Sequence, residues 1–166
     1  FYLPGKRAIR IRLDDCLENH LIWNILSLCD DSRDLRRNRL RFPDAFRLYE
    51  QILAEPLRTH ADANVLRSAT LESAQILASL GRSAEAAERF GSLTDSARAR
   101  LGCAEALVRL GRYGEAASLI ERTTWSDDEA PTAWVLAARA RMLEGSYERA
   151  EQHLELAKRA TTKKTT

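Results

Sequence analysis

The sequence predicts an all-α protein built from repeated helical hairpins. The passage LGRSAEAA at residues 80–87 returns as LGRYGEAA at residues 110–117, and a looser copy, EGSYERAE, occupies residues 144–151. Glycine and proline are scarce, at seven and four residues, and alanine is abundant. Because alanine costs least in a helix whereas glycine and proline cost most, this composition favours helices. The repetition favours one small unit that is used several times.

The glycine of each copy predicts a sharp turn between two helices. Apolar helical patterns flank Gly81, Gly111 and Gly145. Glycine adopts positive φ at little cost, so it can end a helix in the left-handed conformation. An alanine follows five residues after each glycine, and it is small enough for the second helix to pack closely on the first. We therefore expect antiparallel hairpins joined at these three glycines.

The first part of the chain predicts an extended arm followed by a divergent hairpin. Residues 1–13 form the expected N-terminal arm, because Ile9–Leu13 alternates apolar and basic side chains as a half-buried strand does. An apolar helix is expected over Leu17–Leu28, and a second helix starts at Pro43. The expected apolar face of the second helix consists of Ala45, Phe46, Tyr49, Ile52 and Leu53. Residues 14–56 are thus predicted to form a hairpin.

Residues 57–160 predict three further hairpins. Their expected helices are Ala61–Leu80 with Ser83–Phe90, Ser96–Leu110 with Tyr113–Glu121, and a last pair that starts at Pro131 and turns at Gly145. In the last pair Arg141 and Glu144 replace leucines of the earlier copies, and we interpret both as polar capping of a terminal repeat. Residues 161–166 lack apolar side chains and are expected to form a disordered tail.

These hairpins resemble the tetratricopeptide repeat (TPR), in which a helix–turn–helix unit of about 34 residues recurs. The aromatic and small positions of that family are matched in the last copy by Trp134, Ala138, Tyr147, Ala150, Leu154 and Ala157. The resemblance implies a TPR-like α-solenoid of about four helical hairpins, wound as a right-handed superhelix with a concave groove lined by the first helices. It also implies binding of a peptide, helix or partner subunit, without catalysis.

Groove-facing candidates follow from counting back from each turn glycine by the spacing of that family. They are Leu71, Gln75, Ala78, Arg98, Leu101, Glu105, Val108, Val135, Arg139 and Met142. This set is apolar with a few arginines, which suits an amphipathic helix or an extended segment. The alternative is that several of these side chains pack on the next hairpin.

The segment 33–41 carries the densest charge of the sequence. Its cations are Arg33, Arg36, Arg37, Arg39 and Arg41, and Asp34 is its single acid. Such a run predicts a basic patch that anchors the chain on a phosphate or acidic surface. The alternative is a solvated loop that is partly neutralised by neighbouring aspartates.

Catalytic, cofactor-binding and metal sites are not expected. His20, His60 and His153 have no second histidine at i+4, no nearby cysteine and no recognisable acid partner, and the three cysteines lack metal-ligand spacing. The sequence also has no nucleophile elbow, phosphate loop or dinucleotide fingerprint. Because no apolar run reaches membrane-spanning length and no signal sequence opens the chain, an intracellular, cytoplasmic location is expected.

Two functions stay open at this point. The first is a non-catalytic interaction scaffold or adaptor in a larger assembly, which docks through the apolar N-terminal end around Ile9–Leu28. The second is a subunit of a nucleic-acid-containing complex that is anchored by residues 33–41. The net charge of +2 is too small for the chain as a whole to attract a polyanion. Salt separates the two, because phosphate contacts weaken steeply as ionic strength rises.

Overall fold

The computed structural model describes residues 42–54 and 62–163 of the 166-residue chain. These residues form seven α-helices and no strand, which confirms the all-α fold for the part of the chain that is described. The helices are α2 (Phe42–Leu53), α4 (Ala63–Ser79), α5 (Ser83–Gly91), α6 (Ala97–Arg109), α7 (Tyr113–Glu121), α8 (Ala130–Glu144) and α9 (Tyr147–Lys163).

The chain divides into two compact units, Phe1–Ala69 and Thr70–Thr166. The predicted arm over residues 1–13, the predicted helix over Leu17–Leu28 and the arginine-rich segment 33–41 all lie outside the described residues. Helices α5 to α9 belong entirely to the second unit, so most of the described surface is formed there.

Helix α2 belongs to the first unit and begins as its sequence indicates. Pro43 stands in the first turn, where the missing N–H would have no partner in any case. Asp44 stands beside it, where a negative charge is favourable at the positive end of the helix dipole. Ala45, Tyr49 and Ile52 lie at i, i+4 and i+7 and are buried. The amphipathic face expected for this helix is confirmed at these three positions.

In each of three successive hairpins, a glycine lies in the turn between the two helices. Gly81, Gly111 and Gly145 have φ angles of +80°, +77° and +89°. A Cβ at any of them would meet nothing within 4 Å, so the backbone conformation and not crowding requires glycine. The N–H of Arg112 then donates to the carbonyl of Leu107 over 2.9 Å, and an equivalent bond closes the other two turns. These bonds end each helix in the left-handed turn that the sequence predicts.

An arginine–glutamate pair follows two of these turns. The Nε of Arg82 donates to Oε1 of Glu85 over 2.6 Å, and Arg112 donates in the same way to Glu115 over 2.7 Å. Both pairs are exposed to solvent. Exposed ion pairs stabilise little, so these two pairs contribute little to the turns. The conformation of each turn depends on its glycine.

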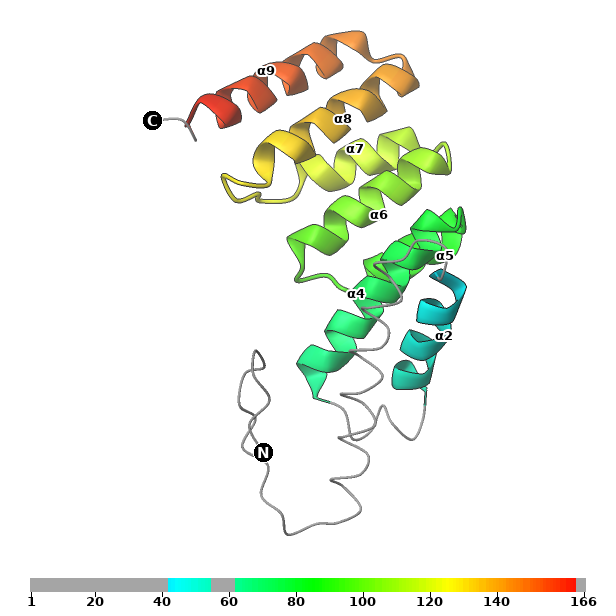
Figure 1. Cartoon of the computed structure of the whole chain (residues 1–166). Helices are drawn as coiled ribbons and strands as arrows, with labels where there is room; N and C mark the ends of the chain where they lie inside the picture. The colour runs from blue at the N-terminus through cyan, green and yellow to red at the C-terminus, as the bar shows by residue number, and fades with distance from the viewer. Residues whose placement is uncertain (1–41, 55–61, 164–166) are drawn as a thin grey trace, which may run out of the picture. The chain divides into compact units, whose positions relative to one another are not determined.

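Helices α5 to α9 pack in chain order, each against the next, as Figure 1 shows. Small side chains lie where the helices cross, and Ala104, Ala116 and Ala133 are fully buried in one core cluster of α6, α7 and α8. The ring of Phe90 in α5 packs directly on Gly102 in α6, where an added Cβ would lie 2.6 Å from the ring. Close-packed interiors tolerate no added volume at such points, so these small residues determine how closely the helices approach.

The last helix is longer than its composition suggests. The observed bounds of α4 to α7 lie within two residues of those expected, but α9 continues to Lys163, past the start of the expected disordered tail at residue 161. The hydroxyl of Thr161 donates to the carbonyl of Ala157 over 2.9 Å, and Thr162 donates to Lys158 over 3.2 Å. Hydroxyls can bond the preceding turn in this way, so a segment without apolar side chains still extends the helix.

Candidate functional site

The groove candidates of α4 and α6 lie close together. Nη2 of Arg98 donates to Oε1 of Gln75 over 3.5 Å, which links the two helices. Nη1 of Arg109 donates to the backbone carbonyl of Ala78 over 2.7 Å. Of the remaining candidates on these two helices, Glu105 is exposed, whereas Leu71 and Leu101 are half-buried. This surface mixes polar side chains with half-buried leucines, and Arg98 and Arg109 are held by neighbours within the chain.

The candidates of α8 form an apolar exposed face. Val135 and Met142 keep 52% and 51% of their surface exposed, and Arg139 lies exposed between them at i+4 from Val135. Leu143 is half exposed next to Met142 and was not among the sequence-derived candidates. Large apolar side chains with this much exposure are unusual when they share one helix face. This face of α8 is the strongest candidate for binding a partner.

Val108 does not belong to such a surface. It is buried in the core cluster, together with residues of α7 and α8 such as Ala116 and Leu136. Helix α6 packs against α5, α7 and α8, so a wider arc of its surface is covered than a single-face pattern would imply. For Val108 the alternative that the side chain packs on the next hairpin is the correct one.

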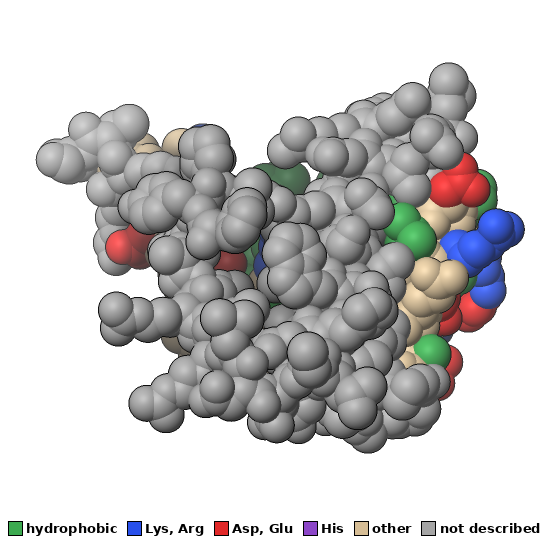
Figure 2. All heavy atoms as spheres, turned by 60° about the horizontal axis from the view of Figure 1, so that its bottom comes forward, with side chains coloured by type: hydrophobic (Ala, Val, Ile, Leu, Met, Phe, Trp, Pro, Cys, Tyr) green, Lys and Arg blue, Asp and Glu red, His purple; other side chains and the backbone are tan. Residues whose placement is uncertain are grey.

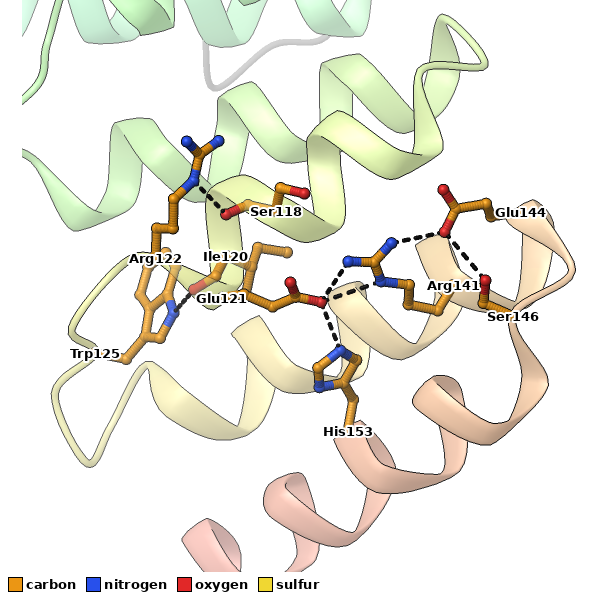
Figure 3. A network of polar contacts seen from close by, with 9 residues as sticks. All are labelled: Ser118, Ile120, Glu121, Arg122, Trp125, Arg141, Glu144, Ser146 and His153. Atoms are coloured by element: carbon orange, nitrogen blue, oxygen red, sulfur yellow. Dashed lines mark hydrogen bonds and ion pairs between the residues drawn. The ribbon is translucent and has the colours of Figure 1, made fainter.

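Arg141 is buried rather than exposed at a capped end. Its exposed fraction is 5%. Its Nε and Nη2 donate to Oε1 of Glu121 over 3.0 and 2.7 Å, and its Nη1 donates to Oε2 of Glu144 over 2.7 Å (Figure 3). The interpretation of Arg141 as a polar cap is therefore wrong. The arginine occupies a leucine position of the earlier repeats because two carboxylates accept its hydrogen bonds inside the fold.

His153 completes this buried cluster. Its Nε2 lies 3.0 Å from Oε1 of Glu121, and its ring stacks on Trp134 with ring centroids 5.5 Å apart and planes 16° apart (Figure 3 shows the contact with Glu121). The expectation that this histidine lacks an acid partner is wrong, because Glu121 comes from another helix, 32 residues earlier. We call Glu121, Trp134, Arg141 and His153 the polar cluster; it joins α7, α8 and α9.

Glu121 and Arg141 of the polar cluster are both charged at neutral pH. Partial burial alone would raise the pKa of Glu121, but the hydrogen bonds from Arg141 and His153 outweigh it and hold that pKa below its ordinary value. Burial alone would lower the pKa of Arg141, but the bonds to Glu144 and Glu121 outweigh it and raise that pKa. An ionised carboxylate shared by two donors fastens three helices together, and α8 is the middle one.

Two expected surfaces lie in parts of the chain that the structure does not describe. The basic patch from Arg33 to Arg41 and the docking end around Ile9–Leu28 lie outside the described residues.

Within residues 42–54 and 62–163, no group of three or more His, Cys, Asp or Glu side chains is arranged to hold a metal ion. The helices of these residues include none that is long and apolar enough to cross a membrane. Figure 2 shows acidic, basic and hydrophobic side chains of the described residues next to one another at one edge of the view.

The repeat geometry is matched by a known family. The family model described as tetratricopeptide repeat matches residues 71–124 and again residues 101–164, which together are more than half of the chain. The chain belongs to the tetratricopeptide repeat family. TPR proteins generally mediate protein–protein interaction or scaffolding and are typically not catalysts. The comparison with curated proteins finds no significant match to a complete TPR protein or to any other.

The TPR register explains what sequence reasoning missed. Arg141 stands at the position of Leu77 and Leu107, which are buried, and this shared position was the available signal that Arg141 is buried too. No comparable signal pointed to Glu121, because its role depends on which side chains of α8 and α9 approach it.

Proposed function

We propose that this TPR protein is a non-catalytic scaffold that holds an amphipathic helix or an extended segment of a partner protein against α8 and the neighbouring first helices. The observation that carries the proposal is the exposed apolar face of α8, where Val135 and Met142 are each about half exposed. Burying such side chains on a partner removes apolar surface from water, which is the main driving force of association.

The charge of this face indicates the chemistry of the partner. Arg139 lies between the two apolar side chains and is exposed. A guanidinium favours a carboxylate with matching geometry. The segment that fits best therefore carries an acidic side chain flanked by apolar ones.

The polar cluster supports binding by holding α8 in one orientation. Arg141 is the residue before Met142, and its hydrogen bonds to Glu121 and Glu144 restrict rotation and sliding of this helix. A binding face presented by a rigid element loses less conformational entropy when a partner binds.

A comparison of captured partners tests this function. The wild-type protein and the Val135→Asp/Met142→Asp variant would be used to capture proteins with a cross-linker, and the captured proteins would be quantified by mass spectrometry. We expect specific partners of the wild type to be depleted at least tenfold with the variant. The control is Leu156→Asp, a partly exposed leucine of α9, which should leave capture unchanged. Equal capture by the Val135→Asp/Met142→Asp variant and by the wild type would contradict the proposal.

Repeating the capture with nuclease treatment distinguishes the alternative function from the protein-binding scaffold. The five arginines of segment 33–41 support a subunit of a nucleic-acid-containing complex. Partners held through nucleic acid would be lost on nuclease treatment and at raised salt, whereas partners held by the apolar face of α8 would persist under both conditions.

A further inference from the structure

The outer face of α9 carries a side chain at a repeat position that is buried in the earlier repeats. Phe90, Ile120 and Leu154 each lie nine residues after a turn glycine. Phe90 and Ile120 are buried, whereas Leu154 is 46% exposed. Tyr147, about two turns before Leu154 on the same side of the helix, is 71% exposed. Among the described repeats, this register position is thus open in the last one.

In the earlier repeats the following helix covers this position. The Phe90 ring packs on Gly102 of α6, and Ile120 belongs to the core cluster that contains α8 residues such as Ala133. No later helix follows α9 within the described residues. The outer face of α9 therefore shares the register of the other inter-repeat faces, but no helix of the described residues buries it.

The charge of this face differs from that of the covered ones. Ala87 and Ala117 are buried at the register position where α9 carries Glu151. Among the described residues, no cation forms an ion pair with Glu151 or with its neighbour Glu148. An occupant of this face would thus meet two apolar side chains and two available carboxylates.

We propose that the outer face of α9, defined as Tyr147, Glu148, Glu151 and Leu154, binds the arginine-rich segment 33–41 of a second copy of this chain. That segment offers five arginines against one acid, together with Leu35 and Leu40. Guanidinium groups bind carboxylates through paired hydrogen bonds and stack on tyrosine rings. The complementary charge is thus supplied by the chain itself.

A second copy is the expected source because hairpins of a repeat array contact only their neighbours along the chain. Segment 33–41 precedes α2 in the sequence, whereas α9 is the last of the described helices. A contact between two different surfaces of identical chains is heterologous, so it extends head to tail instead of closing as a symmetric dimer. This association does not use the face of α8 that the proposed function requires.

Charge reversal in the full 166-residue chain tests the proposal by sedimentation velocity. The wild type should form oligomers whose mass grows with concentration and falls with salt. Glu148→Arg/Glu151→Arg and, separately, Arg36→Glu/Arg37→Glu/Arg39→Glu should each weaken association at least tenfold. Mixing the two reversed variants should restore association, because each variant then supplies the charge that the other needs.

Matched variants keep this outcome interpretable. Glu88→Arg reverses an exposed acid on α5, and Val135→Asp/Met142→Asp alters the face of α8; both should associate like the wild type. Circular dichroism verifies that every variant remains helical. A wild-type chain that stays monomeric at tens of micromolar, or reversed variants whose mixture does not associate, would overturn the proposal without bearing on the face of α8.

Discussion

Arg141 of α8 donates two hydrogen bonds to one and the same oxygen of Glu121 in α7. The arginine side chain is 6% exposed, so both bonds are made almost without competition from water. In the earlier repeats a buried leucine fills this position. The last repeat thus replaces an apolar contact by a charged one that His153 of α9 shares.

We expect Arg141→Ala to destabilise the fold by about 2–3 kcal/mol, because it removes the buried guanidinium that Glu121 and Glu144 share and opens a cavity. The matched control is Arg112→Ala, which removes an exposed arginine–glutamate pair and should change little. Urea denaturation gives both free energies of unfolding. Equal midpoints for the two variants would mean that the polar cluster contributes nothing.

Acid should weaken the polar cluster through Glu121. Its pKa in the folded protein lies below the ordinary 4.5, so the carboxylate stabilises the fold above that value and the contribution is lost as pH falls through the lower folded pKa. Glu121→Gln should therefore lower the melting temperature at neutral pH and converge with the wild type in acid. Glu88→Gln on α5 is the control and should follow the wild-type curve. A constant difference between Glu121→Gln and the wild type down to strongly acidic pH would contradict this account.

The turn glycines should differ from the others in their tolerance of alanine. Gly111→Ala forces a Cβ into the left-handed conformation at φ +77° and should cost about 1–2 kcal/mol. Gly91→Ala, at the end of α5, has an equally open environment without positive φ and should be neutral or slightly stabilising. Thermal unfolding distinguishes the two. A neutral Gly111→Ala would show that φ does not restrict this turn.

The packing of Phe90 on Gly102 should appear as a coupling between the two sites. Gly102→Ala places a Cβ against the ring and should cost about 1–3 kcal/mol through overpacking. In the Phe90→Leu background the smaller side chain leaves room, so the same change should cost less. A double-mutant cycle of unfolding free energies measures this difference. Additive effects would mean that the ring moves aside freely.

The sequence by itself determined the features that depend on local geometry. Gly81, Gly111 and Gly145 could be recognised because positive φ is a property of one residue and its turn. The helix bounds followed from apolar periodicity and from helix-start residues such as Pro43, which stands in the first turn of α2. Val135, Arg139 and Met142 were groove candidates only through the spacing of the TPR family, and all three side chains are exposed on α8.

Tertiary structure alone decided which side chains meet across helices. Val108 is buried because α6 has neighbours on several sides, which a single-helix pattern does not reveal. Arg141 looked like a polar cap because an arginine is stable in water, and it is stable inside the fold only because Glu121 and Glu144 approach it. Partners for a buried charge come from segments distant in sequence, so their meeting is set by helix packing and not by any local pattern.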